Sequence, residues 1–255
     1  MTLNPDIQRR VFSTFDNPNI LAEYLILTIP ISLALLYNSR DLLRKLLVFL
    51  SISLQVLCIV FTYSRGGWLG LFFAILIFSI FVDKRLLFLY LFGLIGLIIS
   101  NQQAIITRIS TITSLEDTSN LYRIELWKDS LKIIKDYWYS GLGFGIDSFK
   151  DIHRHYASPG ILGAHSHNTF LQIFLESGIL GLIGFIVFTV NSIRILLISF
   201  VKGTHIKIKT ISIAILASLL GILLHGLVDY IFFSKKILLM FWILISMGII
   251  GYSFD

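Results

Sequence analysis

The sequence predicts an all-α, polytopic helical membrane protein with about seven transmembrane helices and one long extracytoplasmic helical loop. Of its 255 residues, 56% are hydrophobic and only 14% are charged, whereas soluble domains carry about 25% charged residues. The apolar residues also gather in blocks close to the ~20 residues that a helix needs to cross a bilayer. Composition and block length together therefore favour a chain that crosses a membrane several times.

The elements follow one another in a regular order. A polar lead that ends in Asn17-Pro18-Asn19 precedes the first apolar block, in which Pro30 is tolerable for a membrane helix. Short polar breaks separate the following blocks, and one long polar interval, 101–167, stands between the fourth and the fifth. The predicted spans are 20–37, 46–63, 68–82, 86–100, 178–198, 211–228 and 237–251.

Basic residues concentrate in alternate short loops. These residues are Arg40, Arg44 and Lys45, then Lys84 and Arg85, then Lys202, Lys207 and Lys209. Because loops rich in lysine and arginine stay in the cytoplasm, we expect the interval 101–167 to lie outside. The prediction is a single multi-pass domain, 1–255, in the inner (cytoplasmic) membrane, with 101–167 inserted between spans four and five and an extracytoplasmic active face. An external amino terminus without a signal peptide suggests half of a longer membrane protein, or an unusual short form.

Charge and cysteine content exclude several classes of protein. The net charge is +6, but the basic residues stand between apolar blocks, as membrane topology requires, so no nucleic-acid partner is expected. The single cysteine, Cys58, lies in an apolar block and supports neither a disulfide framework nor a thiolate metal site.

The long interval contains a predicted helix and a glycine-rich break. Residues 121–137 form an amphipathic pattern whose apolar stripe is Leu121, Ile124, Trp127, Leu131 and Ile134. The run 141–145, which carries three glycines, ends that helix and lets the backbone approach another segment closely. No strand precedes these glycines, so a dinucleotide-binding site is rejected. We expect the interval to lie on the outer leaflet, over a cavity between the spans.

Two histidines, His165 and His167, end the long interval where the chain re-enters the membrane. An imidazole there can accept a proton at physiological pH. A helix start with Ser166 or Asn168 as the N-cap is the simpler interpretation. A metal site made of His153, His155, His165 and His167 lacks a carboxylate at convincing spacing, so neither a metal nor a cofactor is expected.

Three arginines are candidates for binding an anionic substrate. Arg65 lies in a short break between two apolar spans, where a charge is costly and usually has a task. Arg108 and Arg123 flank the start of the predicted helix, on the same side of the membrane as His167. Guanidinium groups at such a cavity suit a pyrophosphate, because each donates a fork of hydrogen bonds. For Arg108, an equally good interpretation is that it reaches the phosphates of membrane lipids.

Further polar residues near the spans have structural interpretations. For Glu176, a boundary carboxylate or an arginine partner is favoured over a group that orients another polar side chain. His225 and Asp229 are spaced as one helical turn, which favours a helix-end pair over a polar network beside the cavity.

Several of these motifs together carry a family resemblance. His167-Asn168, nine residues, Gly178, two residues and Gly181 resemble the signature of the bacterial O-antigen ligase and polymerase superfamily. The sequence Tyr63-Ser64-Arg65-Gly66-Gly67 is similar to its membrane-embedded arginine motif. Arg123-x-x-x-Trp127 with the glycine run resembles its outer-loop arginine region, and Asn17-Pro18-Asn19 also matches. The resemblance covers nearly the whole chain, but only the carboxy-terminal half of a typical member.

This resemblance implies a glycosyltransferase that needs neither metal nor nucleotide sugar. Its donor would be an undecaprenyl-pyrophosphate-linked glycan, and the acceptor a hydroxyl of a glycan or lipid at the outer face of the cytoplasmic membrane. His167 would be the catalytic base, selected over His165 by its spacing to Gly178, and the arginines would hold the pyrophosphate. Two alternatives stay open: a solute transporter, related to putative bicarbonate-transport members, and an inactive half-protein that packs with a partner.

Overall fold

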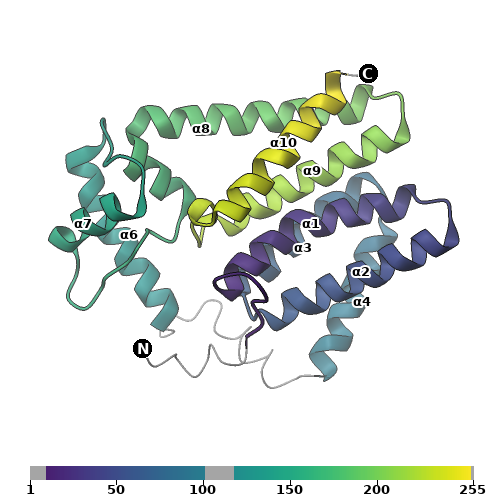
Figure 1. Cartoon of the computed structure of the whole chain (residues 1–255), viewed down its shortest axis with the longest axis horizontal. Coiled ribbons are helices and arrows are strands. Elements are labelled where there is room, and N and C mark those ends of the chain that lie inside the picture. The colour runs from purple at the N-terminus through teal and green to yellow at the C-terminus, as the bar shows by residue number, and fades with distance from the viewer. Residues whose placement is uncertain (1–9, 101–117, 254–255) are drawn as a thin grey trace. The chain divides into compact units, whose positions relative to one another are not determined.

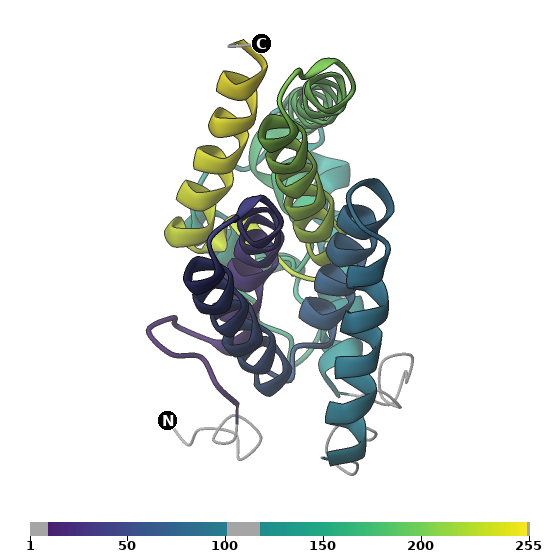
Figure 2. The ribbon, with the colours of Figure 1, turned by 90° about the vertical axis from the view of Figure 1, so that its right-hand side faces the viewer.

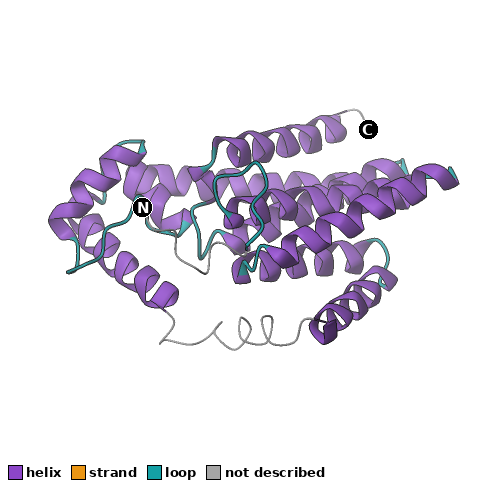
Figure 3. Ribbon diagram, turned by 60° about the horizontal axis from the view of Figure 1, so that its bottom comes forward, coloured by secondary structure: helices purple, strands orange, loops and turns teal. Residues whose placement is uncertain are grey.

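The computed structural model describes residues 10–100 and 118–253 of the chain. All regular secondary structure in these two ranges is helical, as the sequence predicts (Figure 3). The helices, labelled in Figure 1, are α1 Pro18–Asn38, α2 Leu42–Phe61, α3 Arg65–Phe81, α4 Arg85–Ser100, α6 Thr118–Tyr137, α7 Ile146–Tyr156, α8 Thr169–Lys202, α9 Ile206–His225, the short 3-10 helix η1 Ile231–Phe233 and α10 Lys235–Ser253.

The described residues cluster into two compact units. Unit 1 lies within Met1–Ile109, Ile193–His225 and Ser234–Asp255, and unit 2 lies within Ser110–Ser192 and Gly226–Phe233. Helix α8 begins in unit 2 and ends in unit 1. The assignment of the whole chain to one membrane domain, with 101–167 as an extracytoplasmic loop, stays a prediction.

Each of the seven predicted spans falls on an apolar helix. Among the described residues, α1, α2, α8 and α9 are long and apolar enough to cross a membrane, and α3 is a shorter apolar helix. The chain is therefore an all-α membrane protein. Several boundaries differ from the predicted spans, since α2 begins at Leu42, and α9 begins at Ile206 and ends at His225. Helix α3 begins at Arg65, because the side chain of Ser64 accepts a hydrogen bond from the Gly67 N–H and caps the helix there.

Unit 1 is built around α9, which packs against α1, α3 and α10 (Figure 2). Gly70 of α3 and Gly221 of α9 let these two helices approach closely. A Cβ atom added to Gly70 would lie 2.8 Å from the carbonyl oxygen of Gly221. Small residues at such crossings are how membrane helices gain dispersion contacts. The hydroxyl of Ser218 on α9 donates to the carbonyl of Leu27 on α1 at 2.8 Å.

Unit 2 packs α6 and α7 against the first turns of α8. Its core contains Ile133 and Ile134 from α6, Phe149 from α7 and Leu175 from α8. The predicted helix over residues 121–137 is confirmed as α6. Its buried face includes Ile134 of the predicted stripe, but Leu121 and Leu131 on that stripe are exposed.

Two polar residues explain the difference between the predicted and the observed buried face of α6. Asp129 and Ser130 are fully buried beside Leu126 and Ile133. Asp129 accepts hydrogen bonds from the N–H and the hydroxyl of Ser158, at 2.8 and 2.9 Å. Because a buried carboxylate with such partners is tolerated, the polar residues of α6 do not mark its exposed side.

The glycine run after α6 fits against a break in α8. Gly141, Gly143 and Gly145 have positive φ angles, and so has Gly178 within α8, at 66°. The N–H of Gly143 donates to the carbonyl of Glu176 at 3.0 Å, and the Ile179 N–H donates to Trp138 at 2.8 Å. The close backbone approach that the sequence predicts is therefore confirmed. It separates Thr169–Ser177 from the long apolar part of α8, as expected.

Candidate active site around His167

His167 stands immediately before the first turn of α8. The cap of that helix is Asn168, whose Oδ1 accepts a hydrogen bond from the Leu171 N–H at 2.9 Å. Of the two predicted N-cap residues, Ser166 and Asn168, the structure selects Asn168. His167 itself has a φ of 50°, a conformation that is costly for a residue with a side chain. Strained non-glycine residues of this kind cluster at functional sites.

The loop between α9 and α10 is joined to the start of α8 by four hydrogen bonds. The Thr169 N–H donates to Gly226 at 2.7 Å, and the Thr169 hydroxyl donates to the carbonyl of Asp229 at 2.9 Å. That hydroxyl also accepts from the Ile231 N–H at 3.2 Å, and the Asn168 amide donates to Leu227 at 2.9 Å. These bonds fix the loop backbone beside His167.

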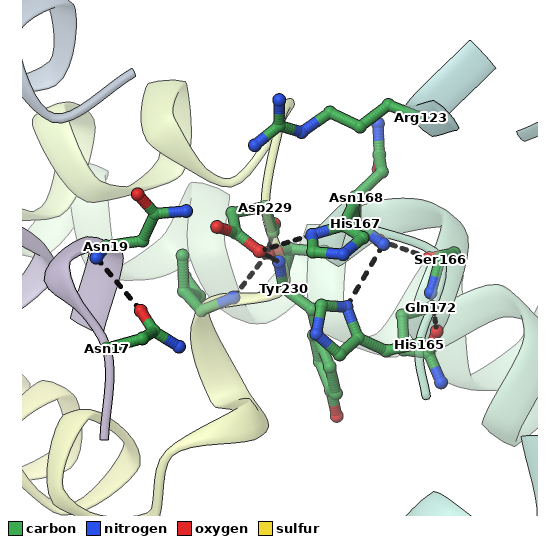
Figure 4. Close-up of polar contacts among 12 residues, drawn as sticks. Asn17, Asn19, Arg123, His165, Ser166, His167, Asn168, Gln172, Asp229 and Tyr230 are labelled. Atoms are coloured by element: carbon green, nitrogen blue, oxygen red, sulfur yellow. Dashed lines mark hydrogen bonds and ion pairs between the residues drawn. The ribbon is translucent and has the colours of Figure 1, made fainter. Parts of the chain in front are cut away.

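Asp229 is brought opposite His167 by this arrangement. The Nδ1 atom of His167 lies 2.9 Å from Oδ1 of Asp229 (Figure 4). The His167 side chain is 25% exposed and that of Asp229 is 9% exposed, so the histidine can meet a substrate while the carboxylate stays behind it. A carboxylate at Nδ1 favours the tautomer in which Nδ1 carries the proton and Nε2 carries the lone pair.

His165 lies beside His167 in a more enclosed position. Their ring centroids are 4.1 Å apart, and the His165 ring also contacts Phe233 at 4.6 Å and Tyr230 at 5.8 Å. Burial, reinforced by the neighbouring His167, lowers the pKa of His165 to about 4. An imidazole with so low a pKa is neutral at pH 7 but is a weak proton acceptor.

Helix α6 contributes further aromatic residues and an arginine near the histidines. The indole of Trp127 donates to the carbonyl of His167 at 3.4 Å, and the ring of Tyr122 stands edge-on to the His167 ring at 6.1 Å. Arg123 lies between these residues and donates to the Ser119 hydroxyl at 2.8 Å. Its positive charge also lowers the pKa of His165. Unit 2 therefore brings together two predicted site residues, His167 and Arg123 (Figure 4).

Arg65 belongs to unit 1, where it is the first residue of α3. The junction before it is strained, since Tyr63 has a φ of 50°. The guanidinium of Arg10 donates to the carbonyl of Thr62 at 2.6 Å and to the Asn19 side chain at 3.0 Å. These contacts hold the α2–α3 junction to the segment before α1. The fourth predicted site residue, Arg108, lies outside the described residues.

Among the described residues, Glu176 belongs to a buried polar network. One carboxylate oxygen accepts from the Gln172 amide at 2.9 Å, and the other accepts from the Tyr230 hydroxyl at 3.2 Å. The Gln172 side chain in turn accepts from the Ser166 N–H at 2.8 Å. Burial raises the pKa of Tyr230, so its hydroxyl keeps the proton that it donates. These hydrogen bonds fit the alternative that Glu176 orients other polar groups, which the sequence interpretation did not favour, and the backbone that they hold is next to His167.

The pairing of Asp229 with His167 is the feature of the site that the sequence interpretation missed. His225 and Asp229 do not share a helix, because α9 ends at His225 and Asp229 lies in the following loop. Within unit 1, Nε2 of His225 lies 3.4 Å from Oε1 of Glu23. One signal was present: Asp229 is the single carboxylate between Glu176 and the terminal Asp255. An acidic residue alone in so apolar a stretch is expected to have a task.

Three side chains of this site also have the chemistry and the proximity of metal ligands. His165, His167 and Asp229 each offer one ligand atom within 4.8 Å of the others. The set considered from sequence is not assembled, since His153 is buried 3.5 Å from Asp129 and His155 is exposed on α7. The structure supplies, in Asp229, the carboxylate that the sequence interpretation found missing.

Comparison of the sequence with known proteins identifies a family for the chain. A search of curated proteins found no match. The sequence model that describes the O-antigen ligase family matches residues 46–186, a range that contains Arg65, Arg123 and His167 and more than half of the chain. The protein is therefore a member of the O-antigen ligase family.

Proposed function

We propose that the protein transfers or polymerises an undecaprenyl-pyrophosphate-linked glycan onto an acceptor hydroxyl at the outer face of the cytoplasmic membrane. Membership of the O-antigen ligase family indicates a role in glycan assembly. The observation that carries the finer proposal is the His167–Asp229 pair at 2.9 Å, on the loop that also faces Arg123. This arrangement offers one group for the acceptor proton and another for the pyrophosphate charge.

His167 is the proposed general base. The acceptor oxygen attacks the anomeric carbon of the donor sugar while the bond from that carbon to the pyrophosphate oxygen breaks. The hydroxyl proton passes to Nε2 of His167, and Asp229 stabilises the imidazolium that forms. General-base catalysis of this kind contributes roughly 10²–10⁴-fold to a rate. Undecaprenyl pyrophosphate leaves as an anion, and the proton on His167 is later lost to water.

The arginines are the proposed partners of the pyrophosphate. Arg123 and Arg65, with Arg108 as a further candidate, stabilise the negative charge that develops as the sugar–phosphate bond breaks. A guanidinium suits this task because its planar fork donates two parallel hydrogen bonds to phosphate oxygens. Since protein groups supply both the base and the positive charge, the proposed reaction requires no metal ion.

Reconstituted protein tests this proposal directly. The full-length protein in liposomes, given a lipid-pyrophosphate glycan and a hydroxyl acceptor, is expected to form the glycan product and release the lipid pyrophosphate. Arg123→Lys should lose roughly 100-fold in transfer, because an ammonium cannot reproduce the fork. Arg154→Ala, at an exposed arginine of α7, serves as the matched control and should transfer normally. Solute flux without transfer would instead identify a transporter.

A further inference from the structure

The three side chains at the centre of the site form a donor set suited to a transition-metal ion. His165 and His167 provide imidazole nitrogens and Asp229 provides a carboxylate oxygen, and one donor atom from each lies within 4.8 Å of the other two. A tetrahedral zinc ion with bonds of about 2.0–2.1 Å holds its ligands roughly 3.4 Å apart. Small rotations of these side chains therefore bring all three donors to bonding distance.

The backbone that carries these ligands is already fixed. Thr169 bonds to both Gly226 and Asp229, and the Ser166 N–H is held by the Gln172 side chain. The Asp229 carboxylate is also oriented by the Tyr230 N–H at 2.9 Å. Such supporting hydrogen bonds favour metal binding, because the ligands lose little freedom when the ion arrives. The partly exposed His167 leaves a path for the ion and a place for water as a fourth ligand.

We propose that His165, His167 and Asp229 bind Zn²⁺ or a similar borderline transition-metal ion, and that the bound ion inhibits the enzyme. The binding claim stands on the donor set alone, whereas the inhibition claim rests on the proposed role of His167. Arg123 brings a positive charge to the same site, so the affinity should be weaker than that of structural zinc sites.

Inhibition is expected because an ion bound to either nitrogen of the His167 ring removes the lone pair that the acceptor proton needs. If the ion binds Nδ1 in place of the hydrogen bond to Asp229, the ring proton moves to Nε2, which then has no lone pair for the acceptor proton. If the ion binds Nε2, it occupies that lone pair itself. In either mode His167 is lost as a base, because a neutral imidazole has one available lone pair.

Binding is tested first, without reference to activity. Isothermal titration of the full-length protein in detergent with Zn²⁺, and the visible spectrum with Co²⁺, should show one site. His165→Ala and Asp229→Asn should each weaken binding by ~10-fold or more and lose the tetrahedral Co²⁺ bands. His155→Ala, at an exposed histidine of α7, is the control and should bind as the wild type does. Unchanged binding in the His165 and Asp229 variants would overturn the assignment.

Transfer measured with and without the ion tests the second claim. Saturating Zn²⁺ should reduce transfer by wild-type protein at least ~10-fold, reversibly with a chelator. The residual transfer of His165→Ala should be insensitive to the same Zn²⁺ concentration, while His155→Ala should remain as sensitive as the wild type. Equal inhibition of the wild type, His165→Ala and His155→Ala would show that Zn²⁺ acts on the substrate and not at this site, which would contradict the proposal. Zinc binding with undiminished transfer would refute the inhibition claim and the role of His167, but not the metal site.

Discussion

At the scale of single residues, the pairing of His167 with Asp229 determines which nitrogen of the His167 ring carries the lone pair. The carboxylate at Nδ1 leaves the lone pair on Nε2, the atom that accepts the proton in the proposed mechanism, and the partly exposed ring is backed by a nearly buried acid. His165, although only two residues away, is enclosed by aromatic rings and has its pKa lowered to about 4 by burial. Two histidines of the same loop therefore have different chemical properties.

Replacement of Asp229 tests whether its carboxylate gives His167 the properties of a base. Asp229→Asn keeps the size of the side chain but removes the charge that stabilises the imidazolium and selects the tautomer of His167. We expect transfer to fall by roughly 100-fold at saturating donor, with little change in donor binding, since Arg123 remains. The measurement is single-turnover transfer with a parallel binding titration. Full activity in Asp229→Asn would remove Asp229 from the mechanism.

The sequence predicts one member of this pair and not the other. His167 is recognisable because it stands at a polar–apolar boundary with fixed spacing to Gly178 and Gly181. Asp229 is 62 residues away, and no helical period connects the two. The hydrogen bonds from Asn168 and Thr169 to the loop after α9 bring them together, and such long-range pairing is not encoded in a local pattern.

At the scale of elements, the contact between the glycine run and α8 sets the geometry of unit 2. A Cβ atom at Gly178 would lie 2.1 Å from the carbonyl oxygen of Tyr139, and one at Gly141 would lie 2.5 Å from that of Glu176. These two positions therefore require glycine for the backbone segments of unit 2 to pack. The sequence predicts the break after α6 and the two parts of α8, but it does not show that the two glycines meet.

Alanine at Gly178 is expected to destabilise unit 2. The positive φ costs about 1–2 kcal/mol for a residue with a Cβ, and the clash with backbone adds to that cost. The midpoint of thermal unfolding in detergent should fall by several degrees. Gly184→Ala, at a helical position of α8 with nothing within 4 Å, should leave the midpoint nearly unchanged. Equal midpoints for the two variants would show that the close approach of Gly178 to Tyr139 does not contribute to the stability of unit 2.

A buried histidine between α6 and α7 predicts acid sensitivity of the same unit. His153 is fully buried and stacked on Phe149, and burial lowers its pKa despite Asp129 at 3.5 Å. The unfolded state therefore binds a proton more readily than the folded state. Stability is complete above about pH 6.5, the unfolded value, and declines as the pH falls below it.

Thermal midpoints at pH 7 and pH 5 measure this contribution. The midpoint should fall on acidification, and the fall should be smaller in His153→Phe, which keeps an aromatic ring against Phe149. His165, whose pKa is also lowered, accounts for part of the remaining fall. His155→Ala is the control at an exposed position and should show the full wild-type fall. An unaltered fall in His153→Phe would show that His153 does not limit stability in this pH range.

At the scale of the whole molecule, the apolar blocks predict the helices well and their boundaries less well. All seven predicted spans fall on helices, because long apolar blocks leave the backbone no other way to satisfy its hydrogen bonds in lipid. The ends of α3 and α9 are set by the Ser64 cap and by the turn after His225, which hydropathy does not detect. The predicted face of α6 differs for a similar reason, since buried Asp129 is satisfied locally.

The orientation in the membrane remains a prediction that labelling can test. Single cysteines at Ser140 and Thr204, both exposed, are introduced after the native cysteine is removed by Cys58→Ser. An impermeant thiol reagent on intact cells should label position 140 at once and position 204 only after permeabilisation, because the basic loops are expected inside. The reverse pattern would invert the topology and place the histidine loop in the cytoplasm.

The central claim, that His167 is the base of a glycan transfer, is tested most directly by single-turnover transfer in His167→Ala and His165→Ala. Both proteins are reconstituted full length with a lipid-pyrophosphate glycan and a hydroxyl acceptor, and donor binding is measured in parallel. We expect His167→Ala to lose roughly 10³-fold in transfer while it still binds the donor, and His165→Ala to lose about 10-fold through poorer positioning. Equal losses in the two variants, or a loss confined to His165→Ala, would contradict the assignment.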